Sequence, residues 1–510
     1  MRKQTKLVAV LSTAALLALG TSMASFAATG WAEENSTWVY YDKDGYQVTD
    51  TWKKSGNNWF WLNEDGEMAT STLVEDGDNT YYVDENGVMV ANRWVQLENE
   101  DYYDSSDSDE EPESVWYYFQ STGKAFKSEN TTSFKTINGK KYAFDSDGQM
   151  LFGWVDQNSQ RVTGDDAFKT ATYYCGDEND GARVSNAWAN LYVSDYGPDD
   201  HEMEDQEYVW FWFQTNGKKF TAADDSAGGL KDKKINGKYY TFDEDGIMRA
   251  EWQSAASASS ASDVRYYSNV DTGARQKGWY QAVPAEWING DDHADEALKW
   301  YYGDSDGKLA VSKIKTVSGK KYLFNEKGEM MTGLVAVQFK EDSTTDIFAY
   351  EKLGDADEVD DDNFYNVVST VKGKKDATEG TVAVYYFSGS SDDGSMKTGS
   401  QTVDVDGDTY QFSFKKNGST KGRGETSTSS DKILYVYGKK IKADTDYKYQ
   451  VVERATGEKY KMTLDEEVSA TTYCIINTSG SIMKGSSSYK DSDENYYKIS
   501  NGKITYSDEK

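Results

Sequence analysis

The chain has 510 residues and a formal net charge of −32 at pH 7. This acidic balance argues against nucleic acid and anionic membranes as partners, because both need a basic surface. Its 38 Tyr and 15 Trp beside only 3 Pro indicate a chain of aromatic strands, although the mean hydropathy is −0.79. Two cysteines, Cys175 and Cys474, are too few for a disulfide framework, but a single bridge between them stays open.

The first 27 residues have the features of a secretory signal peptide. Three positive charges, at Arg2, Lys3 and Lys6, precede an apolar run that ends at Leu19, and a small-residue cleavage site follows at Ala27. The run is too short for a permanent membrane span, and no later run approaches the required length. We therefore expect an exported protein that does not insert into a membrane.

From residue 30 onward, short aromatic strands alternate with acidic turns that end in glycine. In the strand at residues 59–62 (WFWL) the side chains alternate between two faces, and residues 63–66 (NEDG) supply the turn. The first three turn glycines, Gly45, Gly66 and Gly87, are spaced by 21 residues. Further copies end at Gly123, Gly148, Gly181, Gly217, Gly246, Gly273, Gly307 and Gly328. A period of about 20 residues is typical of solenoids, so we predict an all-β fold, a β-solenoid of stacked β-hairpins, over residues 28–335.

A second Trp precedes several of these hairpins, in the strand that leads to them. The leading Trp is seven residues before the hairpin Trp in the pairs Trp31 and Trp38, and Trp52 and Trp59. It is 21 or 22 residues before it, across an insertion, in the pairs Trp94 and Trp116, Trp188 and Trp210, and Trp279 and Trp300. Insertions at one position of a solenoid repeat fall on one face. We therefore expect acidic inserts such as residues 98–114 and 199–207 to form a fringe along that face.

The units resemble a known class of repeat. The GW pairs at residues 153–154 and 278–279, and the segments NGKKYAFDSDGQM (138–150) and NGKYYTFDEDGIM (236–248), are similar to the choline-binding and glucan-binding repeats of Gram-positive cell-surface proteins. They are also similar to the carbohydrate-binding repeats of clostridial toxins. The resemblance covers about residues 30–335. It implies hairpins wound into a left-handed solenoid, with ligand cages between adjacent hairpins built from two aromatic residues of one unit, one of the next and often a Met or Leu.

Such a cage can hold a quaternary ammonium, which aromatic faces attract, or a sugar ring, which stacks on them. Carried over residue by residue, the resemblance gives these ligand-binding candidates: Trp31, Trp38, Trp52, Trp59, Trp61, Tyr82, Trp94, Trp116, Trp188, Trp210, Trp279 and Trp300. The best pairs are Trp31 with Trp38 and Trp52 with Trp59, closed by Trp61 and Tyr82, because no insertion separates them. The alternative for any single Trp is a structural role, in which it only stacks on its neighbours in the core.

Two other repeat positions bear on the cages. A Met follows the turn at Met68, Met89, Met150, Met248 and Met330. The hairpin Trp is replaced at Tyr81, Lys141, Lys238 and Lys321. We expect the units with these replacements to lack a full choline cage.

Residues 336–510 have a different character, because no Trp lies beyond Trp300. Aromatic runs such as residues 385–387 (YYF) recur there without regular spacing. We interpret this region as degenerate repeats or a small β-rich C-terminal domain. The last residues, 506–510 (YSDEK), carry no sorting signal for covalent wall attachment, which agrees with noncovalent attachment.

No residue pattern indicates catalysis, a metal site or a cofactor. Both histidines, His201 and His293, lie in acidic loops without the spacing of a zinc motif. The recurring D-x-D-G is better explained as turn chemistry than as a calcium loop, and Asp404 to Asp408 is only a weak calcium candidate.

The sequence thus predicts a non-catalytic secreted protein that stays on the cell surface, bound noncovalently to the wall. Its partner would be choline-bearing teichoic acid or wall polysaccharide. Two alternatives stay open: an adhesin for host glycans, and a wall hydrolase whose divergent catalytic region is residues 340–510.

Overall fold

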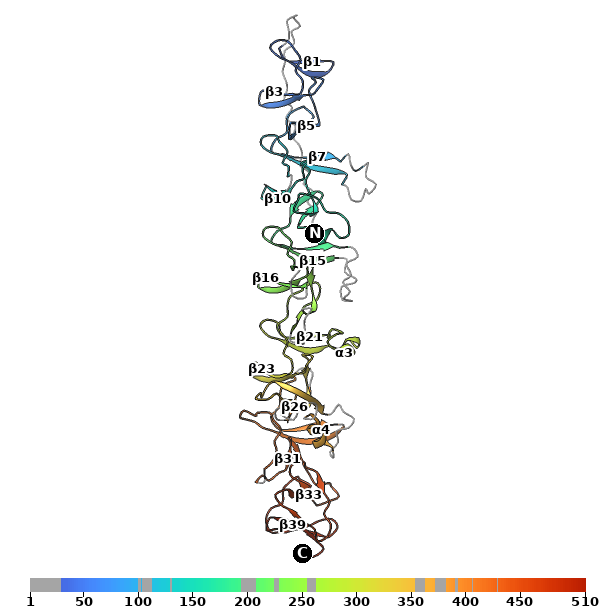
Figure 1. Ribbon diagram of the computed structural model, residues 1–510, viewed down its shortest axis with the longest axis vertical. Coiled ribbons are helices and arrows are strands. Elements are labelled where there is room, and N and C mark those ends of the chain that lie inside the picture. Colours follow the sequence, from blue (N-terminus) through green and yellow to red (C-terminus); the bar gives the residue numbers. More distant parts are fainter. Residues whose placement is uncertain are drawn as a thin grey trace. The chain divides into compact units, whose positions relative to one another are not determined.

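The computed structural model describes residues 29–99, 102, 112–128, 131–193, 208–223, 229–254, 263–353, 363–371, 382–389, 393–405, 407–428 and 430–510. The predicted signal peptide, most of both acidic inserts and His201 lie outside the described residues. In the described part, antiparallel strands of two to seven residues predominate beside three short helices (Figure 1). The prediction of an all-β fold is therefore confirmed.

The chain divides into two compact modules. The N-terminal module extends to Lys231 and includes Phe242–Met248, and the C-terminal module comprises Asp232–Thr241 and Arg249–Lys510. The predicted boundary at residue 335 stays a prediction.

Among the described elements of the N-terminal module is one short helix, α2 (Ala167–Thr170), between β11 and β12. Its strands are β1 (Gly30–Glu34), β2 (Thr37–Tyr41), β3 (Thr51–Ser55), β4 (Asn58–Leu62), β5 (Thr72–Asp76), β6 (Asn79–Val83), β7 (Arg93–Glu98), β8 (Ser114–Phe119), β9 (Phe134–Ile137), β10 (Lys140–Ala143), β11 (Gly153–Val155), β12 (Tyr173–Asp177), β13 (Asp180–Arg183), β14 (Ala187–Tyr192) and β15 (Tyr208–Phe213). Next along the chain come β16 (Lys231–Ile235), β17 (Lys238–Phe242) and β18 (Met248–Arg249).

The described part of the C-terminal module includes the helices α3 (Gly290–Ala294) and α4 (Phe364–Thr370). Its strands are β19 (Glu251–Ser254), β20 (Val264–Tyr267), β21 (Gly278–Ala282), β22 (Lys299–Gly303), β23 (Lys313–Val317), β24 (Lys320–Phe324), β25 (Met330–Met331), β26 (Gly333–Phe339), β27 (Ile347–Leu353), β28 (Val382–Phe387), β29 (Gly399–Val405), β30 (Asp408–Phe414), β31 (Tyr435–Val436), β32 (Lys439–Lys440), β33 (Tyr449–Glu453), β34 (Lys459–Tyr460), β35 (Glu467–Ser469), β36 (Tyr473–Asn477), β37 (Ser488–Lys490), β38 (Tyr496–Ser500) and β39 (Lys503–Ser507).

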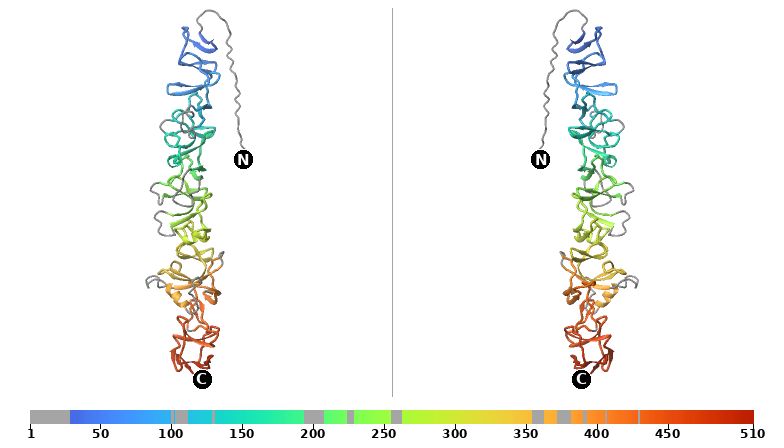
Figure 2. Two further views of the ribbon diagram at one scale, coloured as in Figure 1. Left: turned by 90° about the vertical axis from the view of Figure 1, so that its right-hand side faces the viewer. Right: turned by 90° about the vertical axis from the view of Figure 1, so that its left-hand side faces the viewer.

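Many strands pair only with their neighbour in sequence, as expected for hairpin repeats (Figures 1 and 2). These two-stranded hairpins are β1-β2, β3-β4, β5-β6, β7-β8, β14-β15, β19-β20 and β21-β22. Wider sheets have the orders β11-β12-β13-β10-β9, β23-β24-β25, β27-β26-β28, β29-β30-β32-β31, β34-β33-β36 and β35-β39-β38-β37. The region predicted as β-rich, residues 336–510, is built mostly from these wider sheets.

Many of the turns that follow a hairpin are held by the side chain of their first residue. Oδ1 of Asp42 accepts hydrogen bonds from the backbone N–H groups of Asp44 and Tyr46, both at 2.9 Å. The last turn residue, Gly45, has a φ of 80°, in the left-handed region that glycine reaches without strain. The acidic D-x-D-G motif therefore acts as turn chemistry in this structure.

The core repeats with the turns. The residue four positions before the turn glycine is completely buried in hairpin after hairpin, because strand alternation points it inward. These fully buried residues are Leu62, Val83, Phe119, Phe144, Phe213, Phe242 and Phe324. Each hairpin thus contributes one apolar anchor to a succession of small cores.

Consecutive hairpins of the N-terminal module are tied by backbone hydrogen bonds. The N–H of Met68, just after the second turn, donates to the carbonyl of Trp38 in the first hairpin at 2.7 Å. The N–H of Met89 donates in the same way to Trp59 at 2.8 Å. Each hairpin therefore stacks on the one before it, whereas the winding into a left-handed solenoid stays a prediction.

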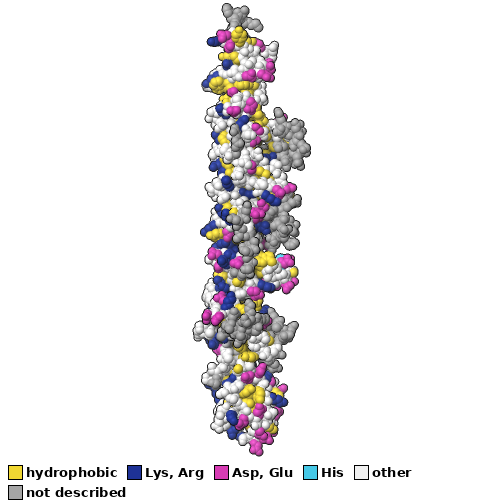
Figure 3. Space-filling model, in the orientation of Figure 1, with side chains coloured by type: hydrophobic (Ala, Val, Ile, Leu, Met, Phe, Trp, Pro, Cys, Tyr) yellow, Lys and Arg dark blue, Asp and Glu magenta, His cyan; other side chains and the backbone are white. Residues whose placement is uncertain are grey.

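Both cysteines are buried free thiols, so the bridge that the sequence left open is absent. Burial raises the pKa of Cys175 to about 12 and that of Cys474 to about 11. On the face drawn in Figure 3, Lys and Arg side chains are interspersed with Asp and Glu. None of the helices in the described part of the chain is long and apolar enough to cross a membrane.

Candidate ligand-binding site

The hairpin register places each leading Trp directly opposite an aromatic residue of the second strand. Trp31 faces Tyr40, Trp52 faces Trp61 and Trp94 faces Tyr118. Cross-strand neighbours lie on one face of a hairpin, and residues two positions along lie on that same face. The hairpin Trp, two residues before the facing aromatic, therefore lies diagonally across from the leading Trp.

Three of the predicted Trp pairs meet as perpendicular rings. The ring centroids of Trp94 and Trp116 are 6.3 Å apart with an interplanar angle of 87°. The other two pairs, Trp188 with Trp210 and Trp279 with Trp300, have the same geometry, at 6.2 Å and 86–88°. We call these three pairs the Trp corners. They are the pairs that the acidic insertions separate in sequence, and pairing of the flanking strands brings them together.

The next hairpin supplies further rings to each corner. Trp94 meets Tyr142 at 5.0 Å and stacks on Phe144 at 5.6 Å. Trp279 likewise meets Tyr322 at 4.7 Å and Phe324 at 5.6 Å. Each corner is thus completed by the unit that follows it.

The two pairs without an insertion are arranged differently. Among the described residues, Trp31 makes its ring contacts with Tyr40 and Phe60, at 5.5 and 5.3 Å, rather than with Trp38. Trp52 meets Trp61 at 5.3 Å, and Tyr81 of the next hairpin at 5.1 Å. Tyr82, expected to close this cage, stacks on Phe119 at 6.1 Å instead.

The hairpin Trp of the second unit is available to solvent. Trp59 is 40% exposed, and Nζ of Lys54 lies 5.7 Å from the centroid of its ring. Trp38, at the equivalent place in the first unit, is partly buried. In these two units the leading Trp therefore contacts other aromatic rings instead of forming a perpendicular corner with the hairpin Trp.

The Met after each turn packs against the turn of the following unit. A Cβ added to Gly87 would lie 2.9 Å from Cε of Met68, and one added to Gly123 would lie 2.5 Å from Sδ of Met89. Met150 packs in the same apolar cluster as Trp94 and Trp116. The post-turn side chain therefore fills the gap between consecutive units, next to the aromatic rings.

The backbone hydrogen bonds correct two positions assigned from the sequence. The post-turn N–H of Ala125 donates to Thr80, and that of Arg275 donates to Tyr239, both at 2.8 Å. Thr80 and Tyr239, not Tyr81 and Lys238, therefore occupy the position of the hairpin Trp. The error was one residue in counting back from the turn glycine.

Four indole N–H groups near these rings are buried without a hydrogen-bond partner in the protein. They belong to Trp31, Trp52, Trp116 and Trp300. A buried indole N–H usually has a partner, so each of these groups is a donor that a ligand oxygen could satisfy.

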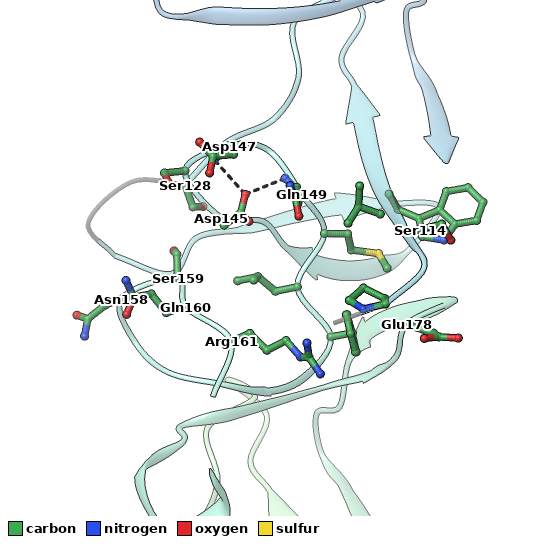
Figure 4. Close-up of a pocket in the computed structure, with 17 residues that line it drawn as sticks. Ser114, Ser128, Asp145, Asp147, Gln149, Asn158, Ser159, Gln160, Arg161 and Glu178 are labelled. Atoms are coloured by element: carbon green, nitrogen blue, oxygen red, sulfur yellow. Dashed lines mark hydrogen bonds between the residues drawn. The ribbon is translucent and has the colours of Figure 1, made fainter. Parts of the chain in front are cut away.

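A polar cavity of about 860 Å³ adjoins the first Trp corner (Figure 4). Its walls include Trp116 and Met150 together with Asp145, Ser159 and Arg161. The full lining is Pro112, Ser114, Val115, Trp116, Ser128, Asp145, Ser146, Asp147, Gln149, Met150, Leu151, Phe152, Asn158, Ser159, Gln160, Arg161 and Glu178.

Two details of this cavity favour a ligand that forms hydrogen bonds. Ser159 is 3% exposed and has a φ of 65°, and its Oγ lacks a partner in the protein. Asp145 is partly buried, which raises the pKa of its carboxyl, while Oδ1 accepts from the N–H of Gln149 at 2.8 Å. Figure 4 shows Ser114 and Glu178 across the cavity from Asn158 and Gln160.

Comparison with known proteins shows similarity to cell-wall-binding repeats. Residues 28–72 and 48–94 match the model of the choline-binding repeat, and residues 132–150 match that of a putative cell wall binding repeat. Residues 28–94 thus match choline-binding repeats, and residues 132–150 match a cell wall binding repeat. The choline-binding repeat matches contain Trp31, Trp38, Trp52 and Trp59, and the cell wall binding repeat match ends at Met150.

Relatives of the choline-binding repeats cover only part of the chain. Glucosyltransferase-S of Streptococcus mutans is 26% identical over 232 residues, which are 45% of this chain and 12% of that protein. The modular autolysin LytC of Streptococcus pneumoniae is 19% identical with a TM-score of 0.32, over 61% of this chain and 55% of that one. Choline binding protein F of the same organism is 18% identical with a TM-score of 0.28, over 59% and 98%.

The described residues contain no group of three or more His, Cys, Asp or Glu side chains placed to hold a metal ion. His293 sits in α3, where its Nδ1 lies 2.9 Å from the carbonyl oxygen of Pro284. In the calcium candidate, the N–H of Gly407 donates to Oδ1 of Asp404 at 3.1 Å, and Asp406 lies outside the described residues.

Proposed function

We propose that the protein is a secreted, non-catalytic surface protein that binds the bacterial cell wall through its Trp corners. The single observation that carries the proposal is the recurrence of the same perpendicular pair at Trp94 and Trp116, at Trp188 and Trp210, and at Trp279 and Trp300. If these Trp only filled the apolar core, their rings would not need to meet at the same perpendicular angle in all three pairs.

The proposed ligand is the choline of wall teichoic acid. Two perpendicular aromatic faces and a thioether suit a trimethylammonium group, which is cationic yet has no hydrogen-bond donor. Each face contributes about 0.5–2 kcal/mol, so the two faces of one corner give at most about 4 kcal/mol, which corresponds to a dissociation constant for free choline of about 1 mM or weaker. Several corners on one polymer would raise the avidity by roughly 10²–10⁴.

Wall polysaccharide is a second candidate ligand, and the cavity beside Trp116 favours it. A trimethylammonium group cannot accept the hydrogen bonds that the Trp116 indole and Ser159 hydroxyl offer, whereas sugar hydroxyls can. The two ligands are compatible, because a choline-bearing polymer also carries sugars.

Sedimentation of the full chain with purified Gram-positive cell walls tests the proposal. The triple variant Trp116→Leu, Trp210→Leu, Trp300→Leu removes one ring from every corner and keeps an apolar side chain there. We expect it to lose wall binding. Trp287→Leu is the matched control, because Trp287 is 56% exposed and belongs to no corner.

Competition distinguishes the ligands. Release of the protein by millimolar choline would support the cation, and release only by wall polysaccharide would support the sugar. Absence of sedimentation with any wall would refute wall binding and favour the host-glycan adhesin. Clearing of a wall suspension by the protein would instead favour the wall hydrolase with its catalytic region at 340–510.

A further inference from the structure

We propose that three gaps between hairpin units are filled by cations of the chain itself, Arg183, Lys219 and Arg275, and that these units are thereby closed to choline. The inference rests on the proposed function for its meaning. Its physical content, an internal cation seated on aromatic rings, can be tested without any ligand.

The three cations occupy the post-turn position that Met holds elsewhere. Met68, Met89 and Met150 each lie two residues after a turn glycine and donate their backbone N–H to a hairpin Trp. Arg183, Lys219 and Arg275 lie two residues after Gly181, Gly217 and Gly273. The N–H of Lys219 donates to Thr172, and that of Arg275 to Tyr239, at the same 2.8 Å.

Lys219 is seated in the most complete set of rings. Its Nζ lies 5.6 Å from the ring of Trp154 and 5.9 Å from that of Phe211. The residue is 7% exposed, and Nζ donates to the carbonyl oxygen of Phe168. Trp154 is a leading Trp that also meets the ring of Tyr174 at 5.1 Å. An ammonium group of the protein thus lies where an ammonium ligand would lie.

Arg275 fills the gap on the aromatic residue that replaces the hairpin Trp. Its guanidinium carbon lies 4.3 Å from the ring centroid of Tyr239, and its side chain is 7% exposed. Nη1 pairs with Oδ2 of Asp232 at 2.6 Å, and the hydroxyl of Tyr267 donates to the same carboxylate at 2.6 Å. The cation is therefore neutralised in place as well as seated on a ring.

Arg183 repeats the arrangement with a different ring. Its guanidinium carbon lies 4.2 Å from the centroid of Phe134. A Cβ added to Gly217 would lie 2.3 Å from its Nε, so the guanidinium fills the space under the next turn. That is the place where Met68 lies under Gly87.

The two kinds of post-turn residue match two kinds of hairpin. A Met follows the hairpins that have the Trp, at Trp38, Trp59 and Trp116. A post-turn cation follows the hairpins in which the hairpin Trp is replaced by Lys141, Thr172 or Tyr239. Other units fit neither kind, because Ala125 lies on Thr80, Met396 lies on Lys321, and Leu309 stands two residues after Gly307. We infer that the units of Ala125 and Met396 have neither a full cage nor an internal cation.

An internal cation excludes a second one by volume and by charge. Two like charges a few ångströms apart repel strongly in a partly dry site, and the side chain already covers the ring face. The three cation units would therefore fill the gaps between hairpins without binding choline. Choline sites would be limited to units that combine a leading or hairpin Trp with an uncharged post-turn side chain.

Equilibrium dialysis of the full chain with labelled choline counts the sites. Met150→Lys installs a cation beside Trp116, and Met150→Leu is its neutral control. Lys219→Met removes the cation from the Trp154 rings. We expect Met150→Lys to lose one site relative to the wild type, Met150→Leu to keep it, and Lys219→Met to gain one. The inference would be overturned if Met150→Lys or Lys219→Met bound the same number of choline molecules as the wild type while keeping a native far-UV circular dichroism spectrum.

Failure of the proposed function gives a distinguishable result. If the wild type binds no choline at all, wall binding through choline fails, and the internal cation is then judged by NMR alone. The ring current of Trp154 should shift the side-chain protons of Lys219 upfield in the lysine-labelled full chain, and the shifted signal should be missing in Lys219→Met. Lysine signals that all lie at random-coil positions would refute the internal cation.

Discussion

Replacement of Lys219 by Met should change how stability depends on pH. Burial lowers the pKa of Lys219 to about 8, from an ordinary value of 10.5. Because the folded pKa lies below the unfolded one, the protonated side chain costs stability below pH 8, and the cost disappears as the pH rises towards 10.5. The lowered pKa corresponds to a loss of about 3 kcal/mol in the free energy of unfolding at pH 7, and about 2 kcal/mol of this loss is recovered by pH 9.5.

The variant lacks this titration, and it also loses the hydrogen bond that Nζ donates to Phe168. The lost bond is worth about 1–3 kcal/mol, so the net change at pH 7 is small, and the pH dependence is the sharper quantity. Urea unfolding of the full chain, followed by tryptophan fluorescence at pH 7 and pH 9.5, measures it. From pH 7 to pH 9.5, we expect the free energy of unfolding of the wild type to rise by about 2 kcal/mol relative to that of Lys219→Met. Lys218→Met, at an exposed neighbour, controls for titrations elsewhere. Parallel pH profiles of wild type and Lys219→Met would refute the burial of a cation at this site.

Three further predictions follow from the turns, the thiols and the cages. Gly87→Ala should lower the free energy of unfolding in urea by about 2 kcal/mol or more, because φ of Gly87 is 74° and the new Cβ would clash with Met68. Gly56→Ala should lower it by only about 1–2 kcal/mol, because Gly56 has a φ of 57° but no atom within 4 Å of the new Cβ. Equal losses in the two variants would show that the close approach is unimportant. Burial raises the pKa of both Cys175 and Cys474, so neither thiol should react with an aromatic disulfide reagent at pH 8 until urea unfolds the chain, and rapid reaction of the folded protein would contradict their burial. Wall-bound protein should resist about 0.5 M NaCl yet be released by choline, since contacts to ring faces are screened far less than exposed ion pairs; release by salt alone would indicate binding through surface charges.

The hairpins could be predicted from the sequence because the features that form each one are local to it. The alternating aromatic run, the acidic residue that bonds its own backbone and the closing glycine are local features, and Asp42 and Gly45 behave as expected. The pairing of Trp94 with Trp116 across an insertion was also predictable, because the repeat showed that the insertion lies between paired strands.

Other parts of the site depend on contacts between units, which the pattern within one unit does not contain. The exact match of Thr80 and Tyr239 to the hairpin Trp became clear only from the hydrogen bonds of the following turn. The cations at Arg183, Lys219 and Arg275 were overlooked for the same reason. A signal was nevertheless present, because all three stand two residues after a turn glycine, where Met recurs.

The backbone bond from each post-turn residue to the previous hairpin has a mechanical consequence. Met68 is joined to Trp38, and Met89 to Trp59, by a single link of this kind between one hairpin and the next. A chain pulled from its ends would therefore release hairpins one after another at similar force. Each release would lengthen the chain by roughly 70 Å, the extended length of about 21 residues. Under fluid shear, a wall-bound protein of this kind would unfold one hairpin at a time and could refold each hairpin when the force falls.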